Sequence, residues 1–254
     1  MRLVLLGDPV SHSRSPAIHA AALGHLGIEG DYSARRVDEA GVGLAVAELR
    51  RHSLDGANVT MPHKRLAGSL CDLLDDDAAA GGVVNTLAVR DGMVMGWNTD
   101  VTALRALASI AVGQGRVLVL GAGGAAAAAI VAFRDRDVVV SARQISAAEA
   151  LRARFAGPAE VVPWGTVIPG ALVVNATPIG MNEERVPEGI IEEASALIDL
   201  PYGTLATPAC DEARRRRIPC VDGVDILVAQ AGESFRIWTG LEPPVEVMRA
   251  VARD

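Results

Sequence analysis

The sequence predicts an α/β protein of two lobes. Short apolar runs alternate with longer helix-like stretches along the 254 residues. From residue 116 onward the runs are continuously apolar and rich in β-branched residues, which is typical of parallel strands buried on both faces. Half of the residues are hydrophobic and 22% are charged, so the chain has enough apolar side chains for a large core and is not disordered.

The first hundred residues contain the predicted elements of the first lobe. Residues 3–7 form a strand, and residues 15–27 form a helix with Ser15 as its N-cap and Pro16 as its first residue. The elements that follow are a helix at 41–52, a strand at 55–61, a helix at 65–81, a hairpin at 83–100 that turns at Asp91-Gly92, and a helix at 101–110.

The second lobe is predicted to be a doubly wound parallel sheet. An alanine-rich helix follows its first strand, and another helix begins at Ser146; the strands are expected at 116–121, 137–143, 160–164, 171–177, 196–202 and 218–223. The tail from residue 224 is again helical. We therefore assign residues 1–100, completed by helices in 224–254, to the first lobe, and residues 101–223 to the second.

Charge and cysteine content argue against several classes of protein. A net charge of −7 disfavours a nucleic-acid partner, and the basic run 214–217 follows Asp211 and Glu212, which favours the last turn of a helix over a phosphate-binding patch. Three cysteines without metal-ligand spacing favour no disulfides, no metal and a reducing cytoplasm. The longest uncharged run, 117–133, is shorter than the ~20 residues that span a bilayer, so no membrane association is expected.

The turn after residue 120 fits the glycine pattern of dinucleotide-binding folds. Gly121, Gly123 and Ala126 occupy the three key positions of G-x-G-x-x-G/A where a strand meets a helix. The first glycine allows the tight turn, the second lets a pyrophosphate approach the backbone, and the small third residue lets helix and strand pack closely. Helix propensity explains the alanines of this segment but not its three glycines. We therefore predict a Rossmann-type domain with the pyrophosphate at the helix N-terminus.

The end of the next strand indicates which dinucleotide binds. An NAD site requires an acidic residue there for the ribose 2′-hydroxyl. The sequence instead has Ser141, Ala142 and Arg143. Arg143 would face the 2′-phosphate of NADP, and Ser141 and Ser146 could donate hydrogen bonds to it, so the sequence favours NADP over NAD.

Polar side chains gather where the strands of the first lobe end. Ligands of open α/β sheets bind beyond the carboxyl ends of strands. Hydroxyls and amides with one lysine and one aspartate suit a small polyhydroxylated acid. The residues are Ser13, Ser15, Asn58, Thr60, Lys64, Asn85, Thr86, Asn98, Thr99 and Asp100.

Local alternatives remain open for several of these residues. Ser15 and Asp100 can be helix N-caps, Asn58 and Asn85 can satisfy turn backbone, and Lys64 can be a solvated side chain. His63, beside Lys64, is either a second titrating group or an aromatic filler.

Seven motifs in this order resemble the shikimate dehydrogenase family and span essentially the whole chain. They lie at residues 11–19, 58–64, 81–87, 96–100, 121–125, 175–181 and 229–240. The resemblance implies reversible, NADP-dependent reduction of 3-dehydroshikimate to shikimate, at the C3 oxygen of the ring, in the biosynthesis of chorismate and aromatic amino acids. It also implies a small-molecule substrate and a monomer or homodimer, with no nucleic acid or membrane as partner.

The resemblance further implies a role for each matching residue. Lys64 and Asp100 match the catalytic residues, and Ser13 and Ser15 match the serines that bind the substrate carboxylate. Other substrate-binding positions are Asn58, Thr60, Asn85, Tyr202 and Gln230. Cofactor-binding positions are Gly121, Ala122, Gly123, Gly124, Ala125, Ser141, Ala142, Arg143, Ser146, Asp76, Leu200 and Gly223.

The roles of the lysine and the aspartate follow from general acid–base chemistry. A hydroxyl that is oxidised must lose its proton, and Lys64 could accept that proton and return it in the reverse direction. A nearby carboxylate keeps a lysine charged, so Asp100 is expected to orient Lys64 and bind the same hydroxyl. Pro62 would fix the turn that aims Lys64.

The chain departs from the family pattern at several positions. Ser141-Ala142-Arg143-Gln144 stands where the family usually has Asn-Arg-Thr, Val101 stands where a glycine is usual, and Trp97 and Asp225 are less usual residues. The alternatives are therefore a quinate or amino-shikimate dehydrogenase, distinguished through the positions of Ser13 and Tyr202, and a non-catalytic NADP-binding sensor, against which intact Lys64 and Asp100 argue.

Overall fold

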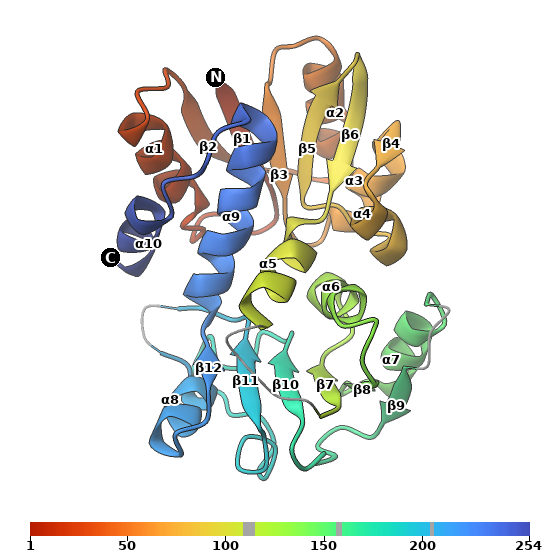
Figure 1. Cartoon of the computed structure of the whole chain (residues 1–254). Helices are drawn as coiled ribbons and strands as arrows, with labels where there is room; N and C mark the ends of the chain where they lie inside the picture. Colours follow the sequence, from red (N-terminus) through yellow and green to blue (C-terminus); the bar gives the residue numbers. More distant parts are fainter. Residues whose placement is uncertain (109–114, 156–158, 204–205) are drawn as a thin grey trace. The chain divides into compact units, whose positions relative to one another are not determined.

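The computed structural model describes residues 1–108, 115–155, 159–203 and 206–254. The chain divides into two compact units (Figure 1). Unit 1 consists of Met1–Thr102 and Leu227–Asp254, and unit 2 of Ala103–Ile226. Within the described residues each unit is built on a six-stranded sheet with helices, so the predicted α/β class is confirmed.

Unit 1 has a mixed sheet in the order β2-β1-β3-β5-β6-β4. Strands β1, β2 and β3 are parallel, whereas β5 runs antiparallel to both β3 and β6. The elements are β1 (Arg2–Gly7), α1 (Ser15–His25), β2 (Asp31–Arg36), α2 (Glu39–Arg50), β3 (Gly56–Val59), α3 (Lys64–Leu70), β4 (Leu73–Leu74), α4 (Asp76–Gly81), β5 (Thr86–Arg90), β6 (Met93–Trp97), α5 (Thr99–Ala108), α9 (Gly223–Thr239) and α10 (Val245–Arg253). Helices α5 and α9 each continue into unit 2.

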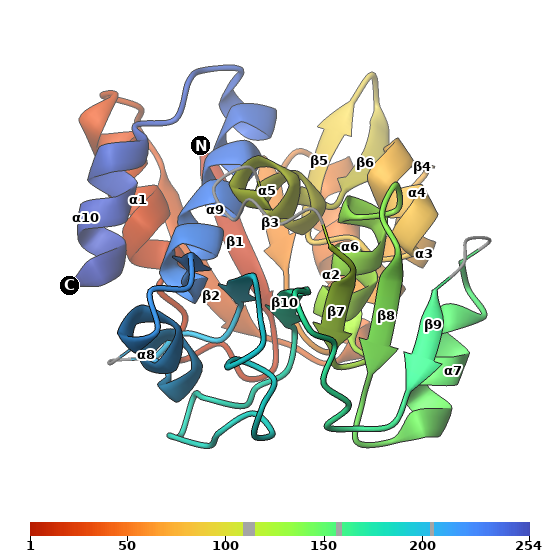
Figure 2. The same cartoon turned by 60° about the horizontal axis from the view of Figure 1, so that its bottom comes forward.

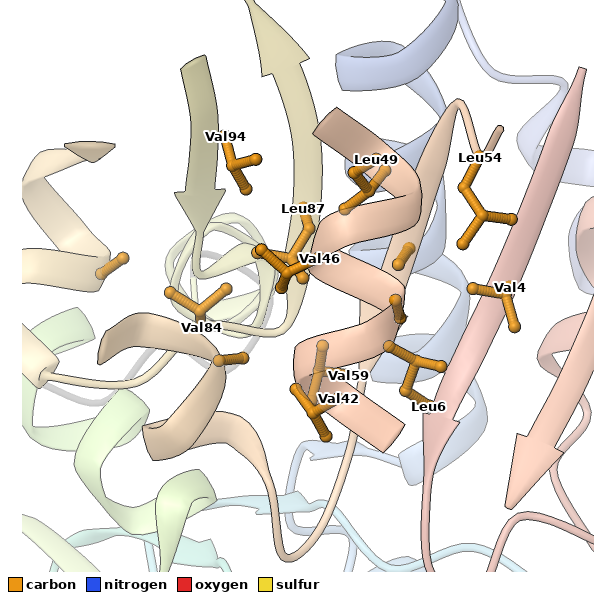
Figure 3. Packing of buried hydrophobic residues seen from close by; sticks show 14 residues of the cluster. Val4, Leu6, Val42, Val46, Leu49, Leu54, Val59, Val84, Leu87 and Val94 are labelled. Carbon is orange, nitrogen blue, oxygen red and sulfur yellow. The ribbon is translucent and has the colours of Figure 1, made fainter. Parts of the chain in front are cut away.

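The central strand β3 sends alternate side chains to two different layers, as the two-residue period of a strand requires. Ala57 and Val59 belong to the apolar cluster under α2, in which Val42, Val46 and Leu49 face the sheet (Figure 3). On the opposite face, Gly56 lies directly under the indole of Trp238 on α9, since a Cβ there would be 2.3 Å from Nε1. Asn58 therefore points toward α9 and not into the apolar cluster.

Two predictions for unit 1 are wrong, and one strand was not predicted. Ser15 is not an N-cap: the helix already includes it, and Arg14 is the cap residue. Strand β2 was not predicted from the sequence, because Asp31–Arg36 is mostly exposed and carries no apolar alternation. The helix expected at 65–81 is interrupted by β4.

The interruption between α3 and α4 has a local cause. The backbone of Cys71 is extended, and the Asp72 carboxylate accepts hydrogen bonds from the backbone N–H of Val94 (2.8 Å) and from Arg50 (2.7 Å). The next helix then starts with a fresh cap, since Asp75 accepts from the N–H of Ala78 at 2.8 Å. These side-chain contacts to distant strands override local helix propensity.

The predicted hairpin is confirmed. Strands β5 and β6 pair from Thr86–Trp97 to Arg90–Met93. Asp91 and Gly92 both have positive φ, 51° and 77°, as a two-residue type I′ turn requires. The helix expected at 101–110 begins two residues earlier as α5, and its last two expected residues lie outside the described ones.

Unit 2 has the predicted doubly wound parallel sheet, in the order β12-β11-β10-β7-β8-β9. Figure 2 shows β7, β8 and β9 side by side. The elements are β7 (Val117–Leu120), α6 (Gly124–Ala132), β8 (Val138–Ser141), α7 (Ile145–Arg152), β9 (Glu160–Val162), β10 (Leu172–Asn175), β11 (Ala196–Asp199), α8 (Pro208–Arg215) and β12 (Cys220–Val221). The strand order reverses between β7 and β10, which is the place where such sheets bind ligands.

The basic run 214–217 behaves as the end of a helix. Arg215 and Arg216 pair with Glu212 one turn earlier, and Arg214 pairs with Asp222 at 3.3 Å. Among the described residues, no helix combines the length and the apolarity needed to cross a bilayer.

Unit 1 encloses an imidazole without hydrogen bonds. Both ring nitrogens of His19 on α1 are buried and lack a partner. The ring stacks on Tyr32 with centroids 4.4 Å apart and planes at 9°, and it lies 5.2 Å from the ring of Trp238. Burial lowers the pKa of His19 to about 3. The folded protein therefore keeps this ring neutral at a pH where the unfolded chain protonates it.

The buried His19 should make stability depend on pH in a defined window. Between pH 6.5 and about 3 the unfolded chain binds a proton on this residue and the folded chain does not, so acidification destabilises the fold. The slope from this one group is about 1.4 kcal/mol per pH unit. Urea unfolding of His19→Phe from pH 7 to pH 4 should show a pH dependence shallower by that amount than the wild type. Exposed His12, changed to Gln, serves as the control and should leave the slope unchanged; equal slopes for His19→Phe and wild type would contradict the assignment.

Candidate active site

Lys64 and Asp100 form an ion pair within unit 1. Nζ of Lys64 donates to Oδ2 of Asp100 at 2.5 Å, and the two side chains are only 20% and 14% exposed. Lys64 is thus not a solvated side chain. Its neighbour His63 is buried, with Nε2 2.8 Å from the carbonyl oxygen of Val37, so His63 holds the turn before α3 to the rest of the unit.

Two helix starts bring this pair together. Lys64 is the first residue of α3, after the turn at Pro62, and Asp100 is the second residue of α5. Asp100 is not the N-cap, because the helix already begins at Thr99. A carboxylate in the first turn of a helix interacts favourably with the helix dipole. Asp100 therefore holds the ammonium at a defined point and leaves two of its three hydrogens for other acceptors.

The amides of Asn58 and Asn85 lie in one buried hydrogen-bonded group. Nδ2 of Asn58 is 3.0 Å from the carbonyl oxygen of Asn85 and 3.0 Å from Oγ1 of Thr86. Oδ1 of Asn85 accepts from the backbone N–H of Thr99 at 2.9 Å, directly before Asp100. Oγ1 of Thr99 is also 3.4 Å from Oε1 of Gln230 on α9. The structure thus brings five of the predicted residues together: Lys64, Asp100, Asn58, Asn85 and Gln230.

The serine motif and Thr60 lie at the carboxyl ends of β1 and β3. Ser13 follows β1, and its Oγ accepts from the N–H of Ser15 at 3.2 Å. Ser15 is buried at the start of α1, and Arg14 between the two serines donates to the carbonyl of Ala252 on α10. Thr60 follows β3, and its N–H donates to the carbonyl of Leu6 at 2.8 Å. Asp76 is the first residue of α4.

Two residues belong to the same group of hydrogen bonds but were not predicted from the sequence. Tyr32 donates its hydroxyl to Oδ1 of Asn58 at 2.8 Å, and Ser234 lies with its Oγ 3.0 Å from Nδ2 of Asn58. Tyr32 was not predicted because the strand that carries it, β2, was not predicted. Ser234 sits within a helix 176 residues from Asn58, and no local pattern marks it.

The glycine turn of unit 2 has the geometry of a phosphate cradle. Gly121 has φ +114°, and a Cβ there would lie 2.9 Å from the carbonyl oxygen of Ala176. Gly123 is the N-cap of α6 with no side-chain cap, and nothing lies within 4 Å of a Cβ built on it. The space beside the N-cap of α6 that a side chain at Gly123 would fill is thus open within 4 Å. These features fit a pyrophosphate at the helix N-terminus.

The predicted 2′-phosphate segment runs from the end of β8 into α7, and one of its two serines, Ser141, is buried. The hydroxyl of Ser141 is fully buried and donates to the carbonyl oxygen of Pro163 at 3.0 Å. Ala142 is buried, whereas Arg143 and Ser146 are exposed. Of the four residues predicted for the 2′-phosphate, Arg143 and Ser146 are therefore the ones whose side chains are accessible, whereas the prediction that the hydroxyl of Ser141 donates to the phosphate is not supported because that hydroxyl is bonded to Pro163.

Leu200 and Gly223 meet beyond the end of β11. A Cβ on Gly223 would lie 2.5 Å from the carbonyl oxygens of Leu200 and Pro201, so only glycine fits. Tyr202 follows in the same loop of unit 2. The N–H of Leu200 donates to the carbonyl of Asn175 at 3.1 Å.

A buried carboxylate fixes the base of this loop. Oδ1 of Asp199 accepts from Nδ2 of Asn175 at 2.7 Å, and its other oxygen accepts from the hydroxyl of Thr207. Burial raises the pKa of Asp199, and these hydrogen bonds oppose that rise. Asp199 and Thr207 were not singled out in the sequence.

The structure also describes the less usual residues at 97, 101 and 225. Val101 is fully buried in α5, and Trp97 ends β6 opposite Thr86. The N–H of Asp225, in the first turn of α9, donates to Oδ1 of Asp222 at 3.1 Å.

Two family models match this sequence. Residues 5–87 match the shikimate dehydrogenase substrate binding domain, and residues 223–253 match the shikimate 5′-dehydrogenase C-terminal domain. The first of these segments contains Lys64, Asn58 and Asn85, and the second contains Gln230 and Ser234.

Similar proteins extend the match to nearly the whole chain. The shikimate dehydrogenase (NADP(+)) of Thermococcus kodakarensis is 38% identical over 98% of this chain and 95% of its own length. That of an Anaeromyxobacter species is 39% identical over 97% and 93%. The crystal structure of shikimate 5-dehydrogenase from Thermus thermophilus in complex with NADP(H) and shikimate superposes with a TM-score of 0.89 at 35% identity, covering 100% of this chain and 98% of that one. With such identity along its full length, the chain belongs to the shikimate dehydrogenase family.

Proposed function

We propose that this protein catalyses the reversible, NADP-dependent reduction of 3-dehydroshikimate to shikimate, a step in the biosynthesis of chorismate and aromatic amino acids. The observation that carries the proposal is the half-buried Lys64–Asp100 pair beside the amides of Asn85 and Gln230. The similar Thermus thermophilus enzyme was crystallised with NADP(H) and shikimate. We assign proton transfer and most of the substrate contacts to residues of unit 1, and most of the cofactor contacts to residues of unit 2.

Lys64 is the group that moves the proton in this proposal. In the reductive direction the Lys64 ammonium donates a proton to the carbonyl oxygen that becomes the hydroxyl, and in the oxidative direction the neutral amine accepts that proton back. Asp100 fixes Nζ through the 2.5 Å hydrogen bond and offers its second oxygen to the same hydroxyl. Ser13 and Ser15 bind the carboxylate, and the remaining substrate contacts come from Asn58, Thr60, Asn85, Tyr202 and Gln230.

The cofactor-binding residues follow the open glycine turn. NADP supplies or accepts the hydride when it is bound. Gly121 to Ala125 hold its pyrophosphate through backbone N–H groups, and Arg143 with Ser146 binds the 2′-phosphate. Further contacts come from Asp76, Leu200 and Gly223. Because all three cysteines are free thiols, we propose a reducing cytoplasm as the location, with the protein acting as a monomer or homodimer.

Replacing Lys64 tests the proposed proton transfer. Lys64→Ala should lower kcat for shikimate oxidation with NADP by about 10²–10⁴-fold, because a positioned proton acceptor is lost. Calorimetric titration with shikimate should show that binding persists. Initial rates are measured with shikimate and quinate, each with NADP and NAD.

A matched control variant distinguishes the loss of a catalytic lysine from the loss of an ordinary ion pair. Arg35→Ala removes the half-exposed Arg35–Glu48 pair of the same unit and should leave kcat unchanged. A Lys64→Ala variant with wild-type turnover would refute the role of Lys64. No turnover by the wild type with any of the four combinations would refute the proposed activity itself.

Two alanine substitutions in the glycine turn should have opposite effects. Gly123→Ala puts a methyl group into open space, so stability should be unchanged while the Kd for NADP rises at least tenfold. In Gly121→Ala, a residue with a side chain would have to adopt a φ of +114°, with its methyl group against the Ala176 carbonyl. This variant should lose on the order of 1–3 kcal/mol of unfolding free energy when measured in the absence of cofactor. Fluorescence titration with NADPH and thermal unfolding measure the two effects. Unimpaired NADPH binding by Gly123→Ala would contradict the pyrophosphate site.

A further inference from the structure

We propose that the hydroxyl groups of Tyr32 and Ser234 are positioning groups for this active site, acting through the side-chain amide of Asn58. They hold Asn58, Asn85 and Thr99 in one hydrogen-bonding arrangement, and thereby fix the start of α5 that carries Asp100. The inference rests on the proposed function and deepens it, because it concerns which groups keep the substrate amides and the Lys64–Asp100 pair in register.

The orientation of the Asn58 amide follows from its partners. The carbonyl oxygen of Asn85 is only an acceptor and lies 3.0 Å from one end of the amide, so that end must be Nδ2. The other end is therefore Oδ1, and the hydroxyl of Tyr32 donates to it at 2.8 Å. The reverse orientation would set two acceptors against each other at the Asn85 carbonyl. Tyr32 thus stabilises one of the two amide orientations.

Ser234 joins helix α9 to the same group. Its hydroxyl donates to the carbonyl of Gln230 at 3.0 Å, one turn earlier in the helix. Its Oγ then accepts from Nδ2 of Asn58 at 3.0 Å and lies 2.9 Å from Oγ1 of Thr86, whose one hydroxyl hydrogen is also donated to Oδ1 of Asn85 at 3.0 Å. Ser234 is fully buried, so water does not replace a partner that is lost.

The arrangement continues to the ion pair. The backbone N–H of Thr99 can only donate, which fixes Oδ1 of Asn85 toward α5 at 2.9 Å. Nδ2 of Asn85 then donates to Oγ1 of Thr99 at 3.0 Å, and Oγ1 is 3.3 Å from the hydroxyl of Ser234. The residue after Thr99 is Asp100. A hydrogen-bonded path therefore runs from Tyr32 through Asn58 and Asn85 to the partner of Lys64.

The ring of Tyr32 is itself held in place. It stacks on His19 and lies 6.1 Å from the ring of Trp238, whose Nε1 donates to the carbonyl of Leu87 at 3.1 Å. An aromatic ring clamped in this way gives its hydroxyl a fixed position and loses little entropy when it donates.

The arrangement also limits what Asn58 can recognise. Both of its N–H groups face the acceptors on Asn85, Thr86 and Ser234, and one lone pair of Oδ1 is used by Tyr32. Only the second lone pair of Oδ1 remains for a ligand. Asn58 therefore selects a substrate group that donates a hydrogen bond, such as a ring hydroxyl, over a keto or ether oxygen at the same position.

The test uses Tyr32→Phe, Ser234→Ala and the double variant. Steady-state oxidation of shikimate by NADP should show kcat/KM for shikimate lowered about fivefold or more in each single variant, with the KM for NADP within twofold of the wild type. The double variant should lose less than the product of the two single effects, because both hydroxyls act through Asn58. Thr239→Val is the matched control: it removes a hydroxyl of the same helix that donates to the carbonyl of Phe235 at 2.8 Å, outside the group. That control should leave kcat/KM unchanged.

The same variants are unfolded in urea without substrate. If the unfolding free energies of Tyr32→Phe and Ser234→Ala are non-additive in the double variant, the two hydroxyls are coupled. This result would support the inference even if the wild type does not turn over shikimate; absent turnover would refute only the proposed function. Wild-type kcat/KM in both folded single variants, or strictly additive effects in both measurements, would overturn the inference. A parallel rise in the KM for NADP would assign these residues a general structural role instead.

Discussion

The structure of unit 1 depends on one buried side-chain amide, that of Asn58, which needs hydrogen-bond partners on every side. Asn58 lies on the central strand β3 with only 5% of its surface exposed. A side chain of this kind destabilises the fold unless donors and acceptors surround it. Its partners come from β2, from β5 with the residue before it, and from α9. The position of helix α9 against the sheet of unit 1 is thus tied to a polar contact as well as to the packing of Trp238 over Gly56.

This constraint explains why the ion pair of the site is well defined although it is partly exposed. An isolated surface pair contributes little and does not hold its side chains in one place. Asp100 differs because Thr99, the residue before it, is anchored by the buried Asn85 on both its N–H and its hydroxyl. Lys64 follows a turn that His63 holds to Val37. The two charges meet at 2.5 Å because each backbone is fixed by buried contacts.

Sequence reasoning was most successful where local chemistry decides the structure. Asp91-Gly92 specifies its hairpin, and the continuous apolar strands of unit 2 specify a parallel sheet, because no distant partner is needed to interpret either pattern. It failed at β2 and at the helix expected over 65–81. There the structure depends on contacts between residues far apart in the chain. The Asp72 carboxylate, for example, accepts hydrogen bonds from Val94 and Arg50, each of which lies 22 residues from it in the sequence. Tyr32 and Ser234 escaped notice for the same reason.

The proposed substrate residues of unit 1 and the proposed cofactor residues of unit 2 therefore differ in how far a sequence can specify them. The glycine turn that we propose for the cofactor would act through backbone N–H groups, and its signature is the absence of side chains at Gly121 and Gly123, which a short motif records. The proposed substrate residues include side-chain amides whose orientation is set by Tyr32, Thr99 and Ser234 from three other elements. A substitution at any of these supporting positions would change what Asn58 and Asn85 offer a ligand while leaving every substrate motif intact. Differences in substrate choice among relatives with identical motifs should accordingly be sought in this second layer of residues.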